Sequence, residues 1–541
     1  MTFFIEEAKN KRGEQNMTDE PMMTPEENGT AVGEISAEVP KAPQEDIPRE
    51  GGAPDGEKAP ERKKSRKKIA LLCVGGVVLL TGVALLICLW AGVFSHRTYD
   101  LFSDNGLLLV QRNGYYGYVD KKGEEVIPCV YTEATPFCNG YAVIQEKSDG
   151  SYFYINTKGE KVIDLPFYTA EEFDSHGRAV VRRHKDTFEL IDKKGKTVFS
   201  ADSLMSYDNG YYVYGEKKGD ITVYGIIDAR GKTVLPAKYD GIRFLIDTEK
   251  TEYGKDLIVV TTKTISDSFD ALLTVRGKEL FRTELGGKIG YACQNERIRF
   301  SKKTDGNALF GYINKKGEAV VSADYEEASD FCGGLACVTE NGKQKVIGTD
   351  GKEIFSLAEG HQIEAIDPDG YLLECVDIGG KQTYGILNKQ GGVSVPAIYD
   401  GHIFSAYGNA GLTHLFDGNG NTVLSKGETC ALVKKGGKIL NEKYAAVLYR
   451  LLPGKKDLYL AATEADGNQW DCLDGDGNVL FSLRSGVAPA IETYVFPVSD
   501  DGYIVVKDTV TNTYGVVDAT GKTVVPFIYD SIYSYYGLNQ K

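Results

Sequence analysis

The sequence lacks the short motifs that mark common enzymes and metal sites. Its six histidines are scattered, and none has the H-E-x-x-H or H-x-H spacing typical of zinc sites. It contains no G-x-S-x-G elbow, no P-loop and no G-x-G-x-x-G turn after a strand. These absences predict that the chain is not an enzyme and carries no cofactor. One alternative stays open, a surface hydrolase whose carboxylate pair is assembled from distant loops on folding.

A wide basic surface is also missing. The formal net charge is −15, made up of −8 over residues 1–62, +5 over residues 63–68 and −12 from Ser95 on. Such an acidic balance argues against DNA, RNA or another polyanion as a partner. Proteins and neutral glycans are left as partner classes.

Only one long stretch lacks charged side chains altogether. Residues 69–94 form an uncharged run of 26 residues, and the basic run KKSRKK at 63–68 precedes it. At about 1.5 Å per residue a helix of this length spans roughly 39 Å, enough to cross a bilayer core of about 30 Å. The positive-inside rule then predicts a single-pass signal anchor with residues 1–62 in the cytoplasm and residues 95–541 outside.

Residues 1–62 have no Phe, Trp or Tyr after Phe3 and Phe4 and are rich in Glu, Pro, Gly and Lys. Such a composition predicts a disordered tail, which would be shorter if translation began at Met17. One further hypothesis is a transmembrane sensor whose tail recruits a cytoplasmic partner.

What the sequence does have is a repeat. YGYVDKKGEEVIP at 116–128 returns as YGIIDARGKTVLP at 224–236, YGILNKQGGVSVP at 384–396 and YGVVDATGKTVVP at 514–526. Each copy reads as a strand, a turn and a second strand. The Asp or Asn suits the start of a type I turn, and the following Gly suits the left-handed position of a bulged hairpin. The Gly beside the aromatic residue predicts a close approach of another backbone or ring, and the Pro predicts the end of the second strand.

The residues that define the repeat occupy four positions in each of five copies. They are Tyr116, Gly117, Asp120 and Gly123; Tyr224, Gly225, Asp228 and Gly231; Phe310, Gly311, Asn314 and Gly317; Tyr384, Gly385, Asn388 and Gly391; Tyr514, Gly515, Asp518 and Gly521. The aromatic members are expected to pack between units rather than to face a ligand.

Weaker copies bring the count of turn glycines, and hence of predicted units, to twelve. One unit of about 36 residues cannot bury its own apolar face, so the units must stack. The predicted fold is all-β, an array of antiparallel hairpin or meander repeats that is propeller-like, in one ring, two rings or an open array. It follows a disordered tail and a single transmembrane helix.

These motifs resemble the WG-repeat family, also called KWG repeats, which occurs mostly in bacterial surface and membrane-linked proteins. The resemblance covers roughly residues 100–535, with Tyr or Phe in place of the Trp that names the family except at Trp470. It implies an interaction or scaffold array with no shared catalytic residues.

Two loops come near a calcium-binding pattern but lack its central Gly. One holds Asp417, Asn419 and Asn421, the other Asp474, Asp476 and Asn478, and both coincide with expected repeat turns. Turn geometry is therefore the favoured interpretation. Cys332 and Cys337 are close enough in sequence to form a disulfide, although buried thiols are favoured.

The leading hypothesis is a membrane-anchored protein that binds a surface protein or glycan through many weak contacts. Tyrosines outside the repeat frame are the candidate contact residues, in particular Tyr211, Tyr212 and Tyr214. Packing of these rings at strand ends is the competing interpretation.

Overall fold

The computed structural model describes most of the chain from Arg97 on. The described residues are 97–98, 100–103, 105–146, 150–207, 209–247, 252–304, 306–402, 415–448, 458–465, 467–490, 499, 501–533 and 537–538. The predicted tail, basic run and membrane span, residues 1–62, 63–68 and 69–94, lie outside them. Within the described ranges, no helix has the length and apolarity needed to cross a membrane.

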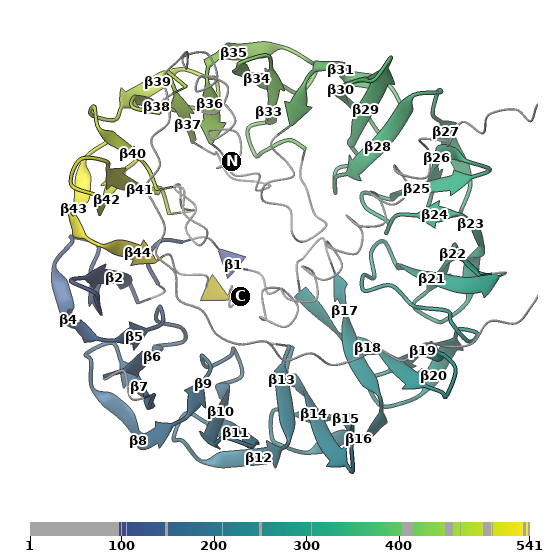
Figure 1. Cartoon of the computed structure of the whole chain (residues 1–541), viewed down its shortest axis with the longest axis horizontal. Helices are drawn as coiled ribbons and strands as arrows, with labels where there is room; N and C mark the ends of the chain where they lie inside the picture. The colour runs from purple at the N-terminus through teal and green to yellow at the C-terminus, as the bar shows by residue number, and fades with distance from the viewer. Residues whose placement is uncertain are drawn as a thin grey trace, which may run out of the picture. The chain divides into compact units, whose positions relative to one another are not determined.

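The described strands form eleven antiparallel sheets arranged in a ring (Figure 1). The first strand of each sheet lies toward the middle of the ring and the last at its periphery. In this order, sheet 1 is β44 (Ser531–Tyr533), β2 (Leu108–Arg112), β3 (Tyr115–Val119), β4 (Glu125–Tyr131); sheet 2 is β5 (Glu133–Ala134), β6 (Tyr141–Gln145), β7 (Tyr152–Asn156), β8 (Lys161–Phe167); sheet 3 is β9 (Thr169–Ala170), β10 (Arg178–His184), β11 (Thr187–Asp192), β12 (Thr197–Ala201); sheet 4 is β13 (Ser203–Ser206), β14 (Tyr211–Lys218), β15 (Ile221–Asp228), β16 (Thr233–Tyr239).

Sheet 5 is β17 (Gly241–Asp247), β18 (Glu252–Lys263), β19 (Ser268–Thr274), β20 (Glu279–Arg282); sheet 6 is β21 (Arg297–Thr304), β22 (Asn307–Asn314), β23 (Ala319–Tyr325); sheet 7 is β24 (Glu327–Ala328), β25 (Leu335–Glu340), β26 (Lys343–Gly348), β27 (Glu353–Ser356); sheet 8 is β28 (His361–Ile366), β29 (Leu372–Ile378), β30 (Lys381–Leu387), β31 (Val393–Tyr399). Sheet 9 is β32 (Gly401–His402), β33 (Asn421–Lys426), β34 (Thr429–Lys434), β35 (Ile439–Tyr444); sheet 10 is β36 (Ala446–Leu448), β37 (Tyr459–Ala462), β38 (Trp470–Leu473), β39 (Val479–Ser482); sheet 11 is β40 (Val487–Pro489), β41 (Tyr503–Asp508), β42 (Thr513–Asp518), β43 (Thr523–Tyr529). A short ribbon pairs β1 (Arg97–Thr98) with β45 (Gly537–Leu538).

The core lies between neighbouring sheets. Leu109 and Tyr118 of sheet 1, for example, pack with Phe137 and Ile144 of sheet 2 in one buried cluster. The second and third strands of a sheet have a neighbour on both faces, so they read as runs of apolar residues rather than as alternating ones. Each unit therefore depends on the next for burial, as the repeat predicts.

The hairpin between the third and fourth strands has the predicted turn. In sheet 1 the Asp120 carboxylate accepts hydrogen bonds from the backbone N–H groups of Lys122 (2.8 Å) and Glu124 (2.9 Å). Gly123 has a φ of +79°, which a residue with a side chain rarely adopts. A Cβ on Gly123 would also lie 2.4 Å from the carbonyl oxygen of Val524 in sheet 11, so this turn rests on the last sheet of the ring.

The Gly of the aromatic-Gly pair faces a bulge in the outer strand. Tyr116 pairs with Tyr131 and Tyr118 with Ile127, which leaves one residue of β3 opposite three of β4. A Cβ on Gly117 would lie 2.6 Å from the backbone nitrogen of Cys129, so the bulged strand fits only over a glycine.

The expectation that the repeat's proline ends the second strand is wrong. Pro128, Pro236, Pro396 and Pro526 lie within β4, β16, β31 and β43. These are outer strands with a register shift at the bulge, where a missing N–H removes no hydrogen bond from the ladder.

The predicted count of twelve units is also wrong, because one of the twelve turns is of a different kind. Gly420 lies in the connection that leads into β33, whereas the hairpin of sheet 9 contains Gly437. The described strands therefore form eleven sheets. These sheets form a single ring rather than two rings or an open array.

The ring is closed by the C-terminal end of the chain. Strand β44 follows sheet 11 in sequence but pairs with β2 and supplies the innermost strand of sheet 1. Ile532 of β44 is buried in a cluster with Leu108 of sheet 1 and Val516 of sheet 11. Asp530 accepts a hydrogen bond from the backbone N–H of Gly114 at 2.9 Å.

Candidate functional site

The loops of the sheets lie on two opposite faces of the ring. Because the strands of each sheet run alternately up and down, the loops alternate between its two ends. The turn face carries the turns between first and second strands and between third and fourth strands. The tip face carries the loops between second and third strands and the connections to the next sheet.

Loops of the turn face are tied to neighbouring sheets. Asp174 of sheet 3 accepts a hydrogen bond from the hydroxyl of Tyr212 of sheet 4. The Arg178 side chain donates to the Ala229 carbonyl in the hairpin of sheet 4 at 2.6 Å. At the closure of the ring, Asp501 accepts from the backbone N–H of Leu101 at 3.0 Å. Side chains on this face thus stabilise the ring.

The tip face, in contrast, presents apolar side chains to solvent. Ile265, Val510 and Ile378 have relative exposures of 109, 86 and 73 %, and Ile221, Leu285 and Tyr115 are also exposed. The other exposed large apolar side chains of the described residues lie on outer strands, apart from Tyr168 at a tip-face connection. These six side chains lie at six different loops, so a partner that spans several loops would bury them together.

The Asp of the recurrent Tyr-Asp pair fixes the loops of the tip face. A Tyr-Asp pair ends or follows three of the fourth strands, β16, β31 and β43, and the Asp of each pair accepts a hydrogen bond from a backbone N–H in the loop of the following sheet. Asp240 accepts from Lys263 at 2.8 Å, and Asp400 accepts from Gly427 at 2.6 Å. The loop that carries Ile265 is therefore held by the preceding sheet, which favours a rigid array of tips.

Polar and aromatic side chains line the inner part of the sheets near this face. The Tyr152 hydroxyl donates to the Glu133 carboxylate at 2.6 Å. In sheets 8 and 9, Glu364 lies 3.1 Å from Nε2 of His402, whose ring packs edge-on against Tyr384 at 4.6 Å between centroids. These groups offer carboxylates, hydroxyls and ring edges to a ligand.

Burial and hydrogen bonding keep the tyrosines protonated. The hydrogen bond to Glu133 raises the pKa of Tyr152 to about 12, and burial raises the pKa of Tyr384 to about 12. Burial also raises the pKa of the Cys337 and Cys472 thiols to about 12. At neutral pH the hydroxyls are hydrogen-bond donors, and these two thiols are not thiolate nucleophiles.

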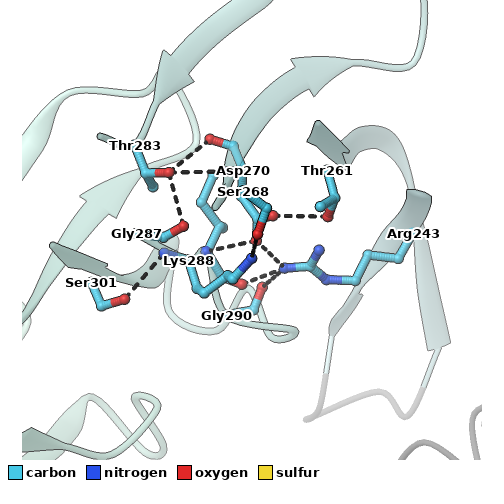
Figure 2. A network of polar contacts seen from close by, with 10 residues as sticks. Arg243, Thr261, Ser268, Asp270, Thr283, Gly287, Lys288, Gly290 and Ser301 are labelled. Carbon is cyan, nitrogen blue, oxygen red and sulfur yellow. Dashed lines mark hydrogen bonds and ion pairs between the residues drawn. The ribbon is translucent and has the colours of Figure 1, made fainter. Parts of the chain in front are cut away.

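Sheet 5 contains a buried charged network. In this sheet an acid takes the place of the repeat's aromatic residue. Asp270 stands where sheet 1 has Tyr116, and its side chain is 3 % exposed. Figure 2 shows Asp270 between Arg243 at 3.3 Å and the Thr261 hydroxyl at 2.8 Å. The backbone N–H of Ile289 also donates to its carboxylate, at 3.1 Å.

This network joins sheets 5 and 6. Sheet 6 has three strands, and the connection that contains Ile289 runs where a first strand would lie, with a bridge to Phe300 of β21. Arg243 donates to the Ile289 carbonyl, and its guanidinium lies 4.6 Å from the centre of the Tyr291 ring. The charges of Arg243 and Asp270 are thus paired with each other within the protein, which makes the network a structural joint.

The calcium-like loops are engaged in hydrogen bonds within the protein. One carboxylate oxygen of Asp417 accepts from the backbone N–H groups of Asn419 (2.8 Å) and Asn421 (2.9 Å), and the other accepts from the Tyr459 hydroxyl of sheet 10. Asp474 likewise accepts from the N–H groups of Asp476 and Asn478, both at 2.9 Å. Over the described ranges, no three His, Cys, Asp or Glu side chains gather as metal ligands would.

The tyrosines predicted to contact a ligand are mostly covered. Tyr212 and Tyr214 are 1 and 4 % exposed, so the prediction is wrong for both. They lie on β14, a second strand, and pack in the cluster between sheets 3 and 4. Tyr211 is half-buried and stacks on Phe244 of sheet 5. Single apolar residues within Gly-, Asp- and Lys-rich loops, such as Ile221 and Ile378, were the signal that sequence reasoning missed.

The repeat-defining residues keep one place in each sheet. The aromatic-Gly pairs lie in the third strands and the turn residues at or just after their ends, in β3, β15, β22, β30 and β42. Tyr514 is buried, and the other four aromatic residues are half-buried against clusters between sheets. Cys337 is a free, buried thiol, so the disulfide with Cys332 that the spacing allows does not form.

A pH dependence is expected from Asp367 on the turn face. Its side chain is fully buried, and burial raises its pKa from 3.8 to about 6. The unfolded chain loses this proton first, so stability should fall as the pH rises from about 4 to about 6, by up to roughly 3 kcal/mol. Urea unfolding of the chain and of Asp367→Asn across this range measures the effect. An unchanged pH slope in the variant would contradict it.

Five stretches of the chain match the model of the WG-containing repeat, at residues 116–148, 152–185, 224–247, 310–343 and 514–537. The chain contains WG-containing repeats. Each matched WG repeat begins at the aromatic residue of a third strand, in β3, β7, β15, β22 or β42. All five of these strands face the bulge of an outer strand.

Comparison with solved structures gives distant likenesses. The crystal structure of the eukaryotic initiation factor is 9% identical, with 70% of this chain and 95% of that chain covered and a TM-score of 0.34. Citrobacter koseri AztD is 10% identical, with coverage of 80% and 95% and a TM-score of 0.22. A protein of unknown function from Bacteroides caccae is 15% identical, with coverage of 44% and 98% and a TM-score of 0.19. No curated protein matches the chain.

Proposed function

We propose that this chain is a membrane-anchored WG-repeat scaffold that binds a partner at the bacterial cell surface through its tip face. The observation that carries the proposal is the one-sided exposure of apolar side chains, led by Ile265, Val510 and Ile378. A rigid ring with many separate tips suits binding through several weak contacts. In this proposal the chain supplies a surface for assembly and no catalysis.

The side chains of the tips favour a protein over a glycan as the partner. Sugars stack on flat aromatic rings, whereas most of the exposed apolar side chains of the described tips are aliphatic, and Tyr115 and Tyr168 supply the exposed rings. Aliphatic side chains gain from burial against another apolar surface, by about 25 cal/mol for each Å² removed from water. The uncharged run at 69–94 and the basic run at 63–68 support an anchored chain with its ring outside the cytoplasm.

Proximity labelling in cells tests this function. The full-length chain carries a labelling enzyme at its C-terminus, and one variant replaces Ile221, Ile265, Ile378 and Val510 with serine. We expect this variant to lose about nine-tenths or more of the labelled partner, because the separate contacts act together.

A matched control changes exposed lysines on the turn face, Lys122, Lys158 and Lys316, to serine. This control should keep the labelling. Equal loss in both variants would contradict a role for the tip face. Labelling that persists in the tip variant and disappears when residues 1–62 are deleted would instead support the sensor hypothesis.

A further inference from the structure

The hairpins between third and fourth strands expose far more bases than acids. Each contains a five-residue turn like that of residues 120–124, in which the N–H of the first residue donates to the carbonyl of the last. Together the eleven turns expose seventeen Lys and Arg side chains and five Asp and Glu side chains, and the turn of sheet 10 alone exposes no base. Lys122, Lys194 and Lys316 are examples from sheets 1, 3 and 6. These eleven turns form a basic rim at the periphery of the turn face (Figure 1).

The inner part of the turn face removes only a part of this charge. Its turns contain Asp174, Asp367 and Asp417, but these side chains are buried and accept hydrogen bonds from backbone N–H groups of their own turns. The exposed acids of the described inner turns are Glu171, Glu172, Glu296 and Asp369. Exposed bases therefore outnumber exposed acids by seventeen to nine over the described turns of this face.

The connections between sheets give the tip face the opposite sign. They expose two bases at that face, Lys288 and Arg484, and six acids. The acids are Asp202, Glu284, Glu326, Glu359, Asp400 and Asp530. The net charge of −12 from Ser95 on is thus unevenly divided, and a broad anionic surface is attracted to the basic rim and repelled by these connections.

The chain enters the ring through the same face as the basic rim. The N–H of Leu101 donates to Asp501 in the turn between β40 and β41, at 3.0 Å, and Phe102 packs edge-on against Tyr503 with 4.9 Å between ring centres. The uncharged run ends at residue 94, seven residues before Leu101. Seven residues extend over at most about 25 Å, so a membrane anchor in that run keeps this point of the turn face close to the bilayer.

We propose that the turn face lies against the membrane and that the bases of its rim bind the anionic headgroups of the bilayer. This inference rests on the membrane anchor of the proposed function. Attraction between a base and an anionic bilayer falls off within a Debye length, about 8–10 Å, so the short link to the anchor brings the rim into range. The tip face then points away from the bilayer, which makes its partner a protein outside the headgroup layer.

Energy transfer to the bilayer tests this orientation, with the full-length chain inserted in vesicles and its ring outside. A donor fluorophore replaces Gln390 in the turn of sheet 8 or Ile378 at the tip of the same sheet, and the acceptor is a labelled lipid headgroup. The seven residues of β30 separate the two faces by about 23 Å. With about 30% phosphatidylglycerol in phosphatidylcholine, we expect at least about twofold more transfer from residue 390 than from residue 378, and a ratio closer to one in phosphatidylcholine alone.

Reversal of charge on the rim should weaken the contact. The variant combines Lys194→Glu, Lys232→Glu and Lys316→Glu, three exposed residues of sheets 3, 4 and 6. We expect transfer from residue 390 to fall by at least about a third in the anionic vesicles, because the rim loses attraction to the headgroups. The matched control reverses three exposed lysines at the tip-face ends of sheets 3, 4 and 5, Lys185, Lys217 and Lys263, and should leave the transfer unchanged.

The outcomes separate this inference from the anchor on which it rests. Chains that alkaline carbonate extracts from the vesicles would overturn the anchor and the orientation together. Inserted chains with equal transfer from the two sites, or with equal effects of the two charge reversals, would overturn the orientation alone. Equal transfer together with binding of soluble polyphosphate that the rim variant abolishes would overturn the bilayer in favour of a soluble polyanion.

Discussion

Replacing Asp270 with alanine should lower the free energy of unfolding by about 3–5 kcal/mol, because it leaves the Arg243 charge without its buried partner. Arg243 is 18 % exposed and its position is constrained by the Ile289 carbonyl and the Tyr291 ring. It has little room to move its charge into water. Urea unfolding of the full-length chain, followed by tyrosine fluorescence, measures the loss.

The control for this prediction is Asp267→Ala, in a pair that is open to solvent. Asp267 lies 3.2 Å from Lys303, with side-chain exposures of 32 and 52 %. Exposed ion pairs contribute about 0–1 kcal/mol, so this variant should unfold close to the original chain. Similar losses in the two variants would show that the network of sheets 5 and 6 is not a structural joint.

Ending the chain after Asp530 should open the ring. The truncation removes β44 and with it the buried side chain of Ile532, whose loss alone is worth about 2–5 kcal/mol. It also exposes the inner edge of β2 and the clusters that sheets 1 and 11 share. Hydrogen exchange should therefore quicken first in β2 and β41, the strands that border the break.

A chain that ends at Leu538 keeps β44 and β45 and serves as the control. We expect its exchange pattern to match that of the full chain. If the shorter chain, without β44, exchanged evenly around the ring or not faster at all, β44 would not be the element that closes it.

Local features of the repeat could be predicted from the sequence because they depend on a few adjacent residues. Asp120 and Gly123 specify a turn through one side-chain acceptor and one left-handed backbone position. Gly117 indicated a close approach of another segment, and the outer strand does cross it. The WG-repeat resemblance and the all-β class rest on the same local signals.

Proline and tyrosine were harder to interpret, since their roles depend on position within the ring. Pro128 lies inside a strand because that strand is an outer edge with a bulge, which no single repeat reveals. The polar side chain of Tyr212 suggested contact with a ligand. Its hydroxyl instead donates to Asp174 of the neighbouring sheet, and the ring is buried. Its partner is 38 residues away in the chain.

The sequence by itself determined the repeat, its hairpin turns, the glycine under the bulge and the all-β class, because these follow from backbone preferences within about a dozen residues. Tertiary structure alone decided that eleven sheets close into one ring through β44 and that apolar tips gather on one face. It also decided that Asp270 is paired with Arg243. Those properties depend on which sheets become neighbours, and burial between sheets joins residues that lie far apart in the chain.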